Sequence, residues 1–403
     1  MHEPQPPTFA VPEARPPAKP NNPFRSPIVV VHVSAEGYGL RAFSSFMTYA
    51  RERGWTVRVA PDQRWWEVPS FIESVKPDGA FVQMGTRTTQ QLLRTNIPVV
   101  NISAAAPNEL PLITMDNTAV GATAAHHLID RGFTHLACLA RDQFWYSQLR
   151  RQGFTSVARA AGLDVHHQDV DVLHPKGQVQ AAFDRNFTKW IASLPKPLGL
   201  FLVGPQRRAL GPLIRECGAK VPDDVALITT GDDPLRCECD DPPVSSVDIP
   251  AEQVGFQAAL LLERLMRGEP PPTEPLLLPP LGVTARLSSD AFAIKDEDVV
   301  DAARFIQQNA PRGIHVSDVL NHVPISRRSL QTRFAKAFGR TVSEEILRRQ
   351  LEQARFLLSN TDLPIDQVAA RSGLVRAQRL CNLFQKHFNT TPRRFRLGQR
   401  HKP

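Results

Sequence analysis

Short apolar runs rich in β-branched residues alternate with helical segments along most of the first 230 residues. The clearest runs cover residues 28–31, 79–82, 198–203 and 225–228. A continuous apolar run without polar alternation is typical of a strand buried on both faces, as in a parallel sheet. Strand–helix alternation at this spacing therefore predicts parallel sheets with helices on both sides.

The same alternation continues through further strands and helices. Strands are also predicted over residues 56–59, 98–102, 112–115, 135–139 and, as the final one, 276–278. Helices are predicted over residues 43–54, 90–94, 119–131, 147–161 and 211–217. Roughly 260 residues of such alternation exceed what one sheet needs, so we predict two doubly wound lobes. Because ligands of open α/β sheets bind beyond the carboxyl ends of the strands, a ligand cleft is expected between the lobes.

The densest local pattern lies near the C-terminus, between Ser326 and Gly339. The Ser326 hydroxyl can accept from free amides of a first helical turn, and Gly339 can adopt the left-handed conformation that ends a helix. Leu330, Phe334 and Phe338 recur every fourth residue and form a narrow apolar stripe. With a short helix predicted just upstream, this pattern predicts a helix-turn-helix.

The opposite face of that helix is basic and polar. It carries side chains that can reach phosphates and base edges: Arg327, Arg328, Gln331, Thr332 and Lys336. In the major groove Gln can pair with adenine, and Arg with guanine, through two hydrogen bonds. We therefore predict that this face binds double-stranded DNA.

Charge is divided unevenly along the chain. Residues 298–403 contain 19 Lys and Arg against 8 Asp and Glu, a net charge of +11. The remaining residues, 1–297, contain 29 against 32, a net charge of −3. A basic C-terminal part on a nearly neutral body indicates one module that binds a polyanion.

The strand pattern stops before residue 290, and helices follow. They are predicted over residues 299–309, 317–323, 326–338, 342–359, 365–372 and 376–387. The proline-rich first residues are typical of a disordered tail. We therefore expect a tail over 1–26, a two-lobed domain over 27–289, a linker over 290–297 and a helical DNA-binding domain over 298–403.

Composition argues against several other classes of protein. The odd number of scattered cysteines indicates a reducing compartment rather than a disulfide framework. These are Cys138, Cys217, Cys237, Cys239 and Cys381. No apolar run approaches the ~18 residues of a membrane span, and the N-terminus lacks the apolar core of a signal peptide. We therefore expect a cytoplasmic protein that does not act on membranes.

Residue patterns also give no indication of an enzyme. Cys237 and Cys239 have neither a second pair nor a nearby histidine, so no metal site is predicted. A convergent nucleophile–base set and a glycine-rich phosphate loop are both missing from the sequence. We therefore predict neither catalysis nor a cofactor.

The C-terminal hundred residues resemble the DNA-binding unit of the AraC family, in which a long helix joins two helix-turn-helices. The matching segments are 326–334 with 338–339, 348–358, 361–369, 372–373, 384–388 and 391–396. The resemblance implies that Arg328, Gln331 and Thr332 contact bases, while Arg327 and Lys336 are better placed for phosphates. The two recognition helices would enter major-groove segments one helical turn, ~34 Å, apart.

The resemblance also implies a second recognition face. Its side chains would be Gln378, Arg379, Cys381 and Asn382. Two residues nearby depart from the family pattern: Leu374 stands in place of Phe, and Asn389 in place of Gly. Both changes are mild, because Leu still fills a core and Asn tolerates the left-handed conformation.

The preceding part, residues 27–289, resembles the sugar-responsive domain of LacI/GalR-type repressors and periplasmic binding proteins. The matching segments are 97–100, 116–117, 127–132, 147–154, 221–226 and 242–247. This domain placed before an AraC-type domain resembles bacterial xylose operon regulators. The resemblance implies a ligand that is a sugar such as xylose or a related polyol.

Two ligand motifs of that family are altered in this chain. The usual Asn-Asp after the strand ending near residue 203 is replaced by Gly-Pro-Gln. After the next strand the family usually has Gly-x-Asp-Asn, whereas residues 229–233 read Thr-Thr-Gly-Asp-Asp, so the Asp is displaced. The candidate ligand residues are Arg150, Asp116, Asp232, Tyr38 and Tyr146. Carboxylates and Arg can form paired hydrogen bonds with sugar hydroxyls, and Tyr can pack against a sugar ring. Each of them has a structural alternative, such as an ion pair of Arg150.

These observations together favour a homodimeric, sequence-specific transcription regulator under the control of a small effector. RNA polymerase is a further candidate partner. One alternative is a regulator whose sensor has lost sugar binding and serves dimerisation. Another is a cytoplasmic solute-binding protein, which the basic C-terminal part does not favour. The sequence leaves open the ligand, the operator, the oligomeric state and the choice between activation and repression.

Overall fold

A computed structural model describes residues 26–60, 65–107, 109–170, 180–204, 210–231, 233–294, 296–388 and 390–400. The tail predicted over 1–26 lies outside these residues apart from its last one. The chain divides into two compact units. The first contains the chain up to Asn117 together with Asp142–Leu149 and Pro250–Leu278. The second contains Thr118–Arg141, Arg150–Ile249 and the chain from Pro279 onward.

The first unit is built on a parallel sheet with the strand order β2-β1-β3-β4. Its strands are β1 (Ile28–His32), β2 (Thr56–Val59), β3 (Gly79–Val82) and β4 (Val99–Asn101), with a second parallel pair, β5 (Ile113–Met115) and β11 (Leu276–Leu278). Its helices are α1 (Gly37–Glu52), α2 (Val68–Val75), α3 (Thr86–Leu92) and α10 (Ala251–Met266).

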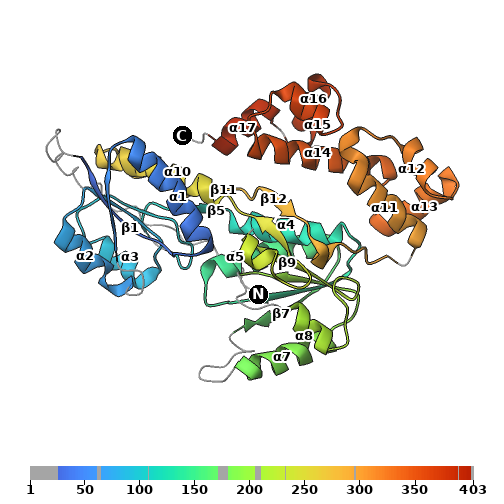
Figure 1. Ribbon diagram of the computed structural model, residues 1–403, viewed down its shortest axis with the longest axis horizontal. Helices are drawn as coiled ribbons and strands as arrows, with labels where there is room; N and C mark the ends of the chain where they lie inside the picture. Colours follow the sequence, from blue (N-terminus) through green and yellow to red (C-terminus); the bar gives the residue numbers. More distant parts are fainter. Residues whose placement is uncertain are drawn as a thin grey trace. The chain divides into compact units, whose positions relative to one another are not determined.

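Helices cover both faces of this sheet, which explains the unbroken apolar run of β1 (Figure 1). Val29 and Val31 pack in the core shared with α1 and α10, whereas Val30 packs in the core shared with α2 and α3. α1 and α10 approach so closely that a Cβ on Gly255 would lie 1.9 Å from the carbonyl oxygen of Ala42. The strand is therefore buried on both sides, as its sequence predicts.

The second unit contains a sheet with the order β12-β10-β9-β8-β6-β7, parallel except for β12. Its strands are β6 (His135–Ala140), β7 (Val165–Asp169), β8 (Leu198–Leu202), β9 (Val225–Thr230), β10 (Ser245–Asp248) and β12 (Gly282–Thr284). Its helices include α4 (Asn117–Ile129), α5 (Trp145–Ala160), α7 (Gln180–Ser193), α8 (Gly211–Glu216) and the short α9 (Pro234–Cys237), with α4 and α5 beginning in residues of the first unit.

Aromatic side chains pack on both faces of this second sheet. Phe187 of α7 shares a core with Leu200, while Phe201 stacks on Phe154 of α5 with ring centroids 5.2 Å apart. The prediction of parallel sheets between helices is thus confirmed. The prediction that 276–278 is the final strand is wrong, because β12 follows it and pairs antiparallel with β10.

From Glu297 onward the described chain is helical (Figure 1). The helices are α11 (Glu297–Asn309), α12 (Val316–His322), α13 (Arg327–Phe338), α14 (Val342–Asn360), α15 (Ile365–Arg371), α16 (Ala377–Phe388) and α17 (Pro392–Arg400). The six predicted helices are each found within two residues of their expected bounds. α17 was not predicted, although Thr391 accepts from Arg394 and Pro392 begins the helix, as helix starts favour.

The long helix α14 packs into two separate cores. Its N-terminal half contributes Val342 and Ile346 to a core with α11, α12 and α13, and its C-terminal half packs with α15 and α16. Between the two cores the buried amide of Gln350 donates to the carbonyl oxygens of Ala310 and Gly373, at 3.2 and 3.1 Å. The same helix therefore positions both helix-turn-helix units.

Candidate nucleic-acid interface and ligand site

α13 begins and ends where its sequence predicts. The Ser326 Oγ accepts from the amide of Ser329 at 3.3 Å. At the other end Gly339 has a φ of 68°, and its amide donates to the carbonyl oxygen of Ala335 at 2.8 Å. Both termini of the helix thus satisfy otherwise unpaired backbone groups.

The two faces of α13 differ as expected. Leu330 and Phe334 are fully buried, and Phe338 is partly buried against the same core. The predicted DNA-binding side chains are all exposed: Arg327, Arg328, Gln331, Thr332 and Lys336. The helix therefore presents a basic and polar face from an apolar base, as a recognition helix requires.

Arg333 was not among the predicted residues, and it faces away from that surface. Its Nε donates to Asp296 at 2.6 Å, and its Nη2 donates to Asp298 at 2.8 Å. The hydrogen bond from Arg333 lowers the pKa of Asp296. Because both carboxylates stand at the start of α11, this contact fixes the rotation of α13 relative to α11. Only the contact between the helices could have identified it.

The second predicted face lies on α16. Gln378, Arg379 and Asn382 are exposed, while Cys381 is partly buried. The Gln378 amide donates to the Asn382 Oδ1 at 3.0 Å, so these two predicted base readers are paired with each other.

Two residues near this face, Leu374 and Asn389, depart from the family pattern. Leu374 is fully buried in the second core, so the substitution of Phe by Leu still fills it. Asn389 lies outside the described residues.

Three candidate ligand residues belong to the first unit. The Tyr38 hydroxyl donates to the carbonyl oxygen of Ile102 at 3.1 Å. The backbone amide of Tyr146 donates to the carbonyl oxygen of Ala104 at 2.8 Å. Both tyrosines are thus brought to the segment that follows β4. Asp116 is half-buried and directly follows β5, where its amide donates to β11.

Arg150 belongs to the second unit and is 6% exposed. Its Nη1 donates to the carbonyl oxygen of Val203 at 2.8 Å, and the hydroxyl of Thr230 donates to the same oxygen at 3.3 Å. The guanidinium group thus lies at the carboxyl end of β8, where ligands of such sheets bind. Asp232 lies outside the described residues.

A parallel α/β part followed by two helix-turn-helix units with exposed basic faces defines a DNA-binding transcription regulator. Residues 125–289 match the model of a periplasmic binding protein-like domain. Residues 319–398 match the model of a helix-turn-helix domain.

More particularly, the chain is similar to proteins described as xylose operon regulatory proteins. It is 28% identical to that of Escherichia coli K12 over 361 residues, 86% of this chain and 90% of the relative. It is 26% identical to that of Haemophilus influenzae over 338 residues, 81% and 87% of the two chains.

Solved structures show the same fold. A structure of the xylose-binding transcription activator xylR matches 93% of this chain and 98% of its own, with a TM-score of 0.59 and 24% identity. The transcription regulator CcpA of Lactococcus lactis matches 66% of this chain and all of its own, with a TM-score of 0.56 and 17% identity.

Among the described residues no helix is long and apolar enough to cross a membrane. The same part of the chain contains no group of three or more His, Cys, Asp or Glu that could hold a metal ion.

Proposed function

We propose that this protein is a sequence-specific regulator whose DNA binding responds to a pentose such as D-xylose or to a related polyol. The observation that carries the proposal is the capped, exposed basic face of α13 on a chain whose relatives are xylose operon regulatory proteins. One of the matching structures is described as a xylose-binding activator.

DNA recognition is divided between two kinds of contact. On α13, Arg328, Gln331 and Thr332 contact base edges in the major groove, and Arg327 and Lys336 contact phosphates. On α16 a second set acts in the next segment of the groove, namely Gln378, Arg379, Cys381 and Asn382. The packing of α14 into both cores supports a fixed spacing of these faces.

The effector binds through a polar set placed at strand ends. Arg150, Asp116 and Asp232 form charge-assisted hydrogen bonds to hydroxyls, and Tyr38 and Tyr146 pack against the ring. The position of Arg150 beside the end of β8 supports its part in this set. The altered motif after β8 removes a carboxylate that related domains use, so the specificity differs from that of the family pattern.

Assembly and location complete the proposal. The regulator is a cytoplasmic homodimer with a sensor over 27–289, a linker over 290–297 and a DNA-binding domain over 298–403. When bound near a promoter it contacts RNA polymerase. The basic charge of the C-terminal residues and the pairing of a sensor with a DNA-binding module support this arrangement.

DNA binding is tested by footprinting the protein on the region upstream of its own gene and of adjacent sugar genes. We expect protection of paired sites and binding at least about 10³-fold tighter than to random duplex of equal length at the same salt. Equal affinity for both DNAs would exclude sequence-specific regulation.

Ligand binding is tested by thermal unfolding with D-xylose, other pentoses, hexoses and polyols. A compound that binds only the native state raises the unfolding temperature, and the rise grows with the logarithm of the ligand concentration once that exceeds Kd. We expect one pentose or polyol to do so, and Arg150→Gln to remove the response. If no compound does, the sensor has lost sugar binding and serves dimerisation.

A further inference from the structure

The motif His-Leu-Ile-Asp-Arg-Gly over residues 127–132 ends α4, and its contacts lie away from the candidate ligand residues. Arg131 Nε donates to the carbonyl oxygen of Ser289 at 2.9 Å, and the Arg131 carbonyl accepts from the amide of Ala293 at 2.9 Å. His127 Nε2 lies 2.7 Å from the Ser289 Oγ. The motif thus binds the segment that connects β12 to α11.

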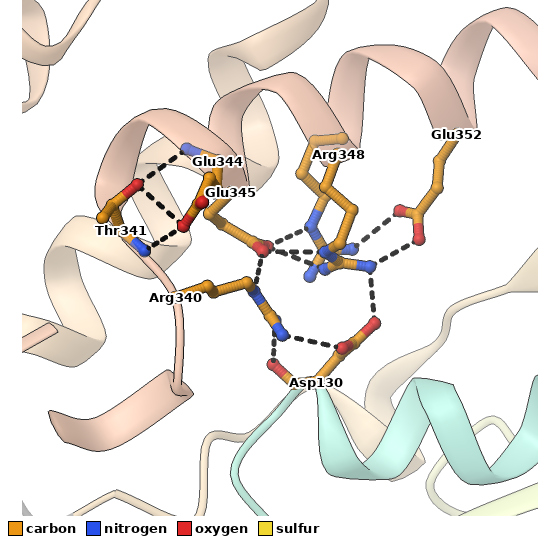
Figure 2. A network of polar contacts seen from close by, with 8 residues as sticks. Asp130, Arg340, Thr341, Glu344, Glu345, Arg348 and Glu352 are labelled. Carbon is orange, nitrogen blue, oxygen red and sulfur yellow. Dashed lines mark hydrogen bonds and ion pairs between the residues drawn. The ribbon is translucent and has the colours of Figure 1, made fainter. Parts of the chain in front are cut away.

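Asp130 of the same motif pairs with two arginines on the DNA-binding side (Figure 2). Its carboxylate lies 3.1 Å from Arg340 and forms a short contact with Arg348, and its carbonyl oxygen accepts from Arg340 at 3.4 Å. The Asp130 side chain is 14% exposed, and the two arginines are 21% and 23% exposed. Charges enclosed in this way interact more strongly than surface pairs, and removing one partner leaves the others unbalanced.

Figure 2 also shows that Arg340 and Arg348 both contact Glu345 of α14. Arg340, Arg348 and Arg349 all donate to Glu345, at 2.6, 2.8 and 2.8 Å. Burial alone would raise the pKa of Glu345, but the hydrogen bond from Arg348 and the three positive charges lower it to about 2. Glu352 adds a second carboxylate. The buried Arg131 adds a further positive charge near Arg349 and Glu352. The cations therefore outnumber these two carboxylates, and Asp130, directly after α4, supplies a third.

On its other side α4 is tightly packed against α5. A Cβ on Gly121 would lie 1.8 Å from the carbonyl oxygen of Arg150, and a Cβ on Gly153 would lie 2.0 Å from that of Thr118. Helices in such close contact cannot slide past each other without breaking backbone packing. A displacement of α5, which carries Arg150, is therefore transmitted to α4.

We propose that the last turn of α4 is the joint through which an effector bound to the sensor orients both recognition helices. Asp130 is the positioning residue that holds the N-terminal half of α14 to the sensor. Because α14 packs into both helix-turn-helix cores, fixing its N-terminal half fixes both units. The effector part of this inference rests on the proposed function, whereas the joint itself does not.

The joint is tested in the full-length protein with Asp130→Asn, Arg348→Gln and the double variant. Asn preserves the shape of Asp and removes its charge. Asp241→Asn is the matched control, because Asp241 pairs with Arg215 at 2.7 Å in the same unit but is 79% exposed. The first measurement is amide hydrogen exchange over residues 126–131, 289–294 and 342–349.

We expect Asp130→Asn to accelerate exchange in these three segments by about tenfold and to leave β8 and β9 as in the wild type. The double variant should exchange more slowly than the sum of the two single effects predicts, since both changes remove the Asp130–Arg348 pair, whereas only Asp130→Asn also removes the pair with Arg340. Asp241→Asn should behave as the wild type. Equal exchange in Asp130→Asn and the control, or acceleration that also spreads through β8 and β9, would overturn the joint.

The second measurement is the ratio of DNA affinities with and without D-xylose. In Asp130→Asn the effect of D-xylose on DNA affinity should be about tenfold smaller than in the wild type, so that the ratio lies closer to one. Affinity for random duplex should change less than about threefold, because no DNA-facing residue is altered. An unchanged ratio in Asp130→Asn would refute the coupling role. If D-xylose leaves wild-type affinity unchanged, the proposed function fails, and the exchange experiment still decides the joint.

Discussion

The two helix-turn-helix units share a helix order but differ in the turn before the recognition helix. In the first unit the turn over residues 323–326 contains no residue with positive φ, and Ser326 caps α13. In the second unit the turn contains Gly373 with a φ of 78° and Val375 with a φ of 65°. The first turn is thus specified by local hydrogen bonding, and the second by an unusual backbone conformation.

The second turn keeps that conformation because of contacts from the first unit. The Gly373 carbonyl accepts from Gln350, and the same amide donates to Ala310 at the end of α11. A side chain at Gly373 would collide with this region. The comparison indicates that the first helix-turn-helix unit is defined largely by its own sequence. The second helix-turn-helix unit depends on how α14 brings the two cores together.

The largest expected effect is that of Gly373→Ala. Its Cβ would lie 2.4 Å from the Ala310 carbonyl oxygen and 2.7 Å from the Gly313 amide, in addition to the strain at positive φ. We expect a loss of about 3 kcal/mol or more in the free energy of unfolding, measured by urea denaturation.

The control for this variant is Gly339→Ala in the first unit. Gly339 also has a positive φ, but a Cβ there meets no atom within 4 Å. Only the backbone strain remains, so a loss of about 1 kcal/mol is expected. Similar losses in both variants would show that the second turn does not depend on contact with the first core.

The next prediction compares the two DNA-binding faces. Gln331→Ala should change the preferred base at one position by about 1–3 kcal/mol, measured by competition binding with single-base operator variants. Gln378→Ala should have a smaller effect, because Gln378 must first break its hydrogen bond with Asn382. Equal shifts from both changes would show that the two faces contribute alike.

Lys336→Ala serves as the contrast to both glutamine variants. A phosphate contact carries no base information, so this change should weaken binding to all sequences alike. It should also reduce the slope of log affinity against log salt by about one. A change of base preference in Lys336→Ala would mean that the assignment of base and phosphate contacts on α13 is wrong.

Most of the fold could be predicted because its strongest patterns are local. Buried strands such as β1 and β8 contain long apolar runs, and α13 has a cap, a stripe and a terminating glycine. Edge strand β7 was missed because its sequence, Val-His-His-Gln-Asp, has none of that character. β12 was missed because its three residues, Gly-Val-Thr, give too short a pattern.

The candidate sites show the same division. The exposed face of α13 follows from its helical spacing, and its five side chains are exposed as expected. The roles of Arg333, Gln350 and Asp130 could not be predicted, because their partners lie 37, 40 and 218 residues away in sequence. Charge and polarity identify a surface, whereas contacts between distant segments decide which charged residues belong to it.

Acid should loosen the first helix-turn-helix unit, which contains α13, more than the second, which contains α16. Burial, followed by the charges of Arg131, Arg349 and Arg348, holds the pKa of His127 well below its usual 6.5. In the unfolded chain His127 has its usual pKa of 6.5, so below this pH the unfolded chain binds a proton that the folded chain does not. The free energy of unfolding therefore falls as the pH falls below 6.5. The slope for one such group is about 1.4 kcal/mol per pH unit.

The measurement is the free energy of unfolding between pH 7 and pH 5 for the wild type and His127→Gln, combined with hydrogen exchange. The variant should lose most of that slope, because Gln does not titrate. In the wild type, protection of residues 126–131 and 342–349 should fall at pH 5 before that of α16. A parallel loss in α16 would place the acid-sensitive group elsewhere.

The smallest expected effect concerns Val375, which is 69% exposed and has a φ of 65°. A β-branched residue in the left-handed region is strained by its Cβ, and Gly removes the strain at some entropic cost. Val375→Gly should therefore raise the free energy of unfolding by about 0.5–1 kcal/mol in urea denaturation. Val375→Ala keeps a Cβ and should gain less than half as much. If both variants are neutral or destabilising, the turn before α16 is held without local strain, and the contrast with the turn before α13 lies only in the contacts around Gly373.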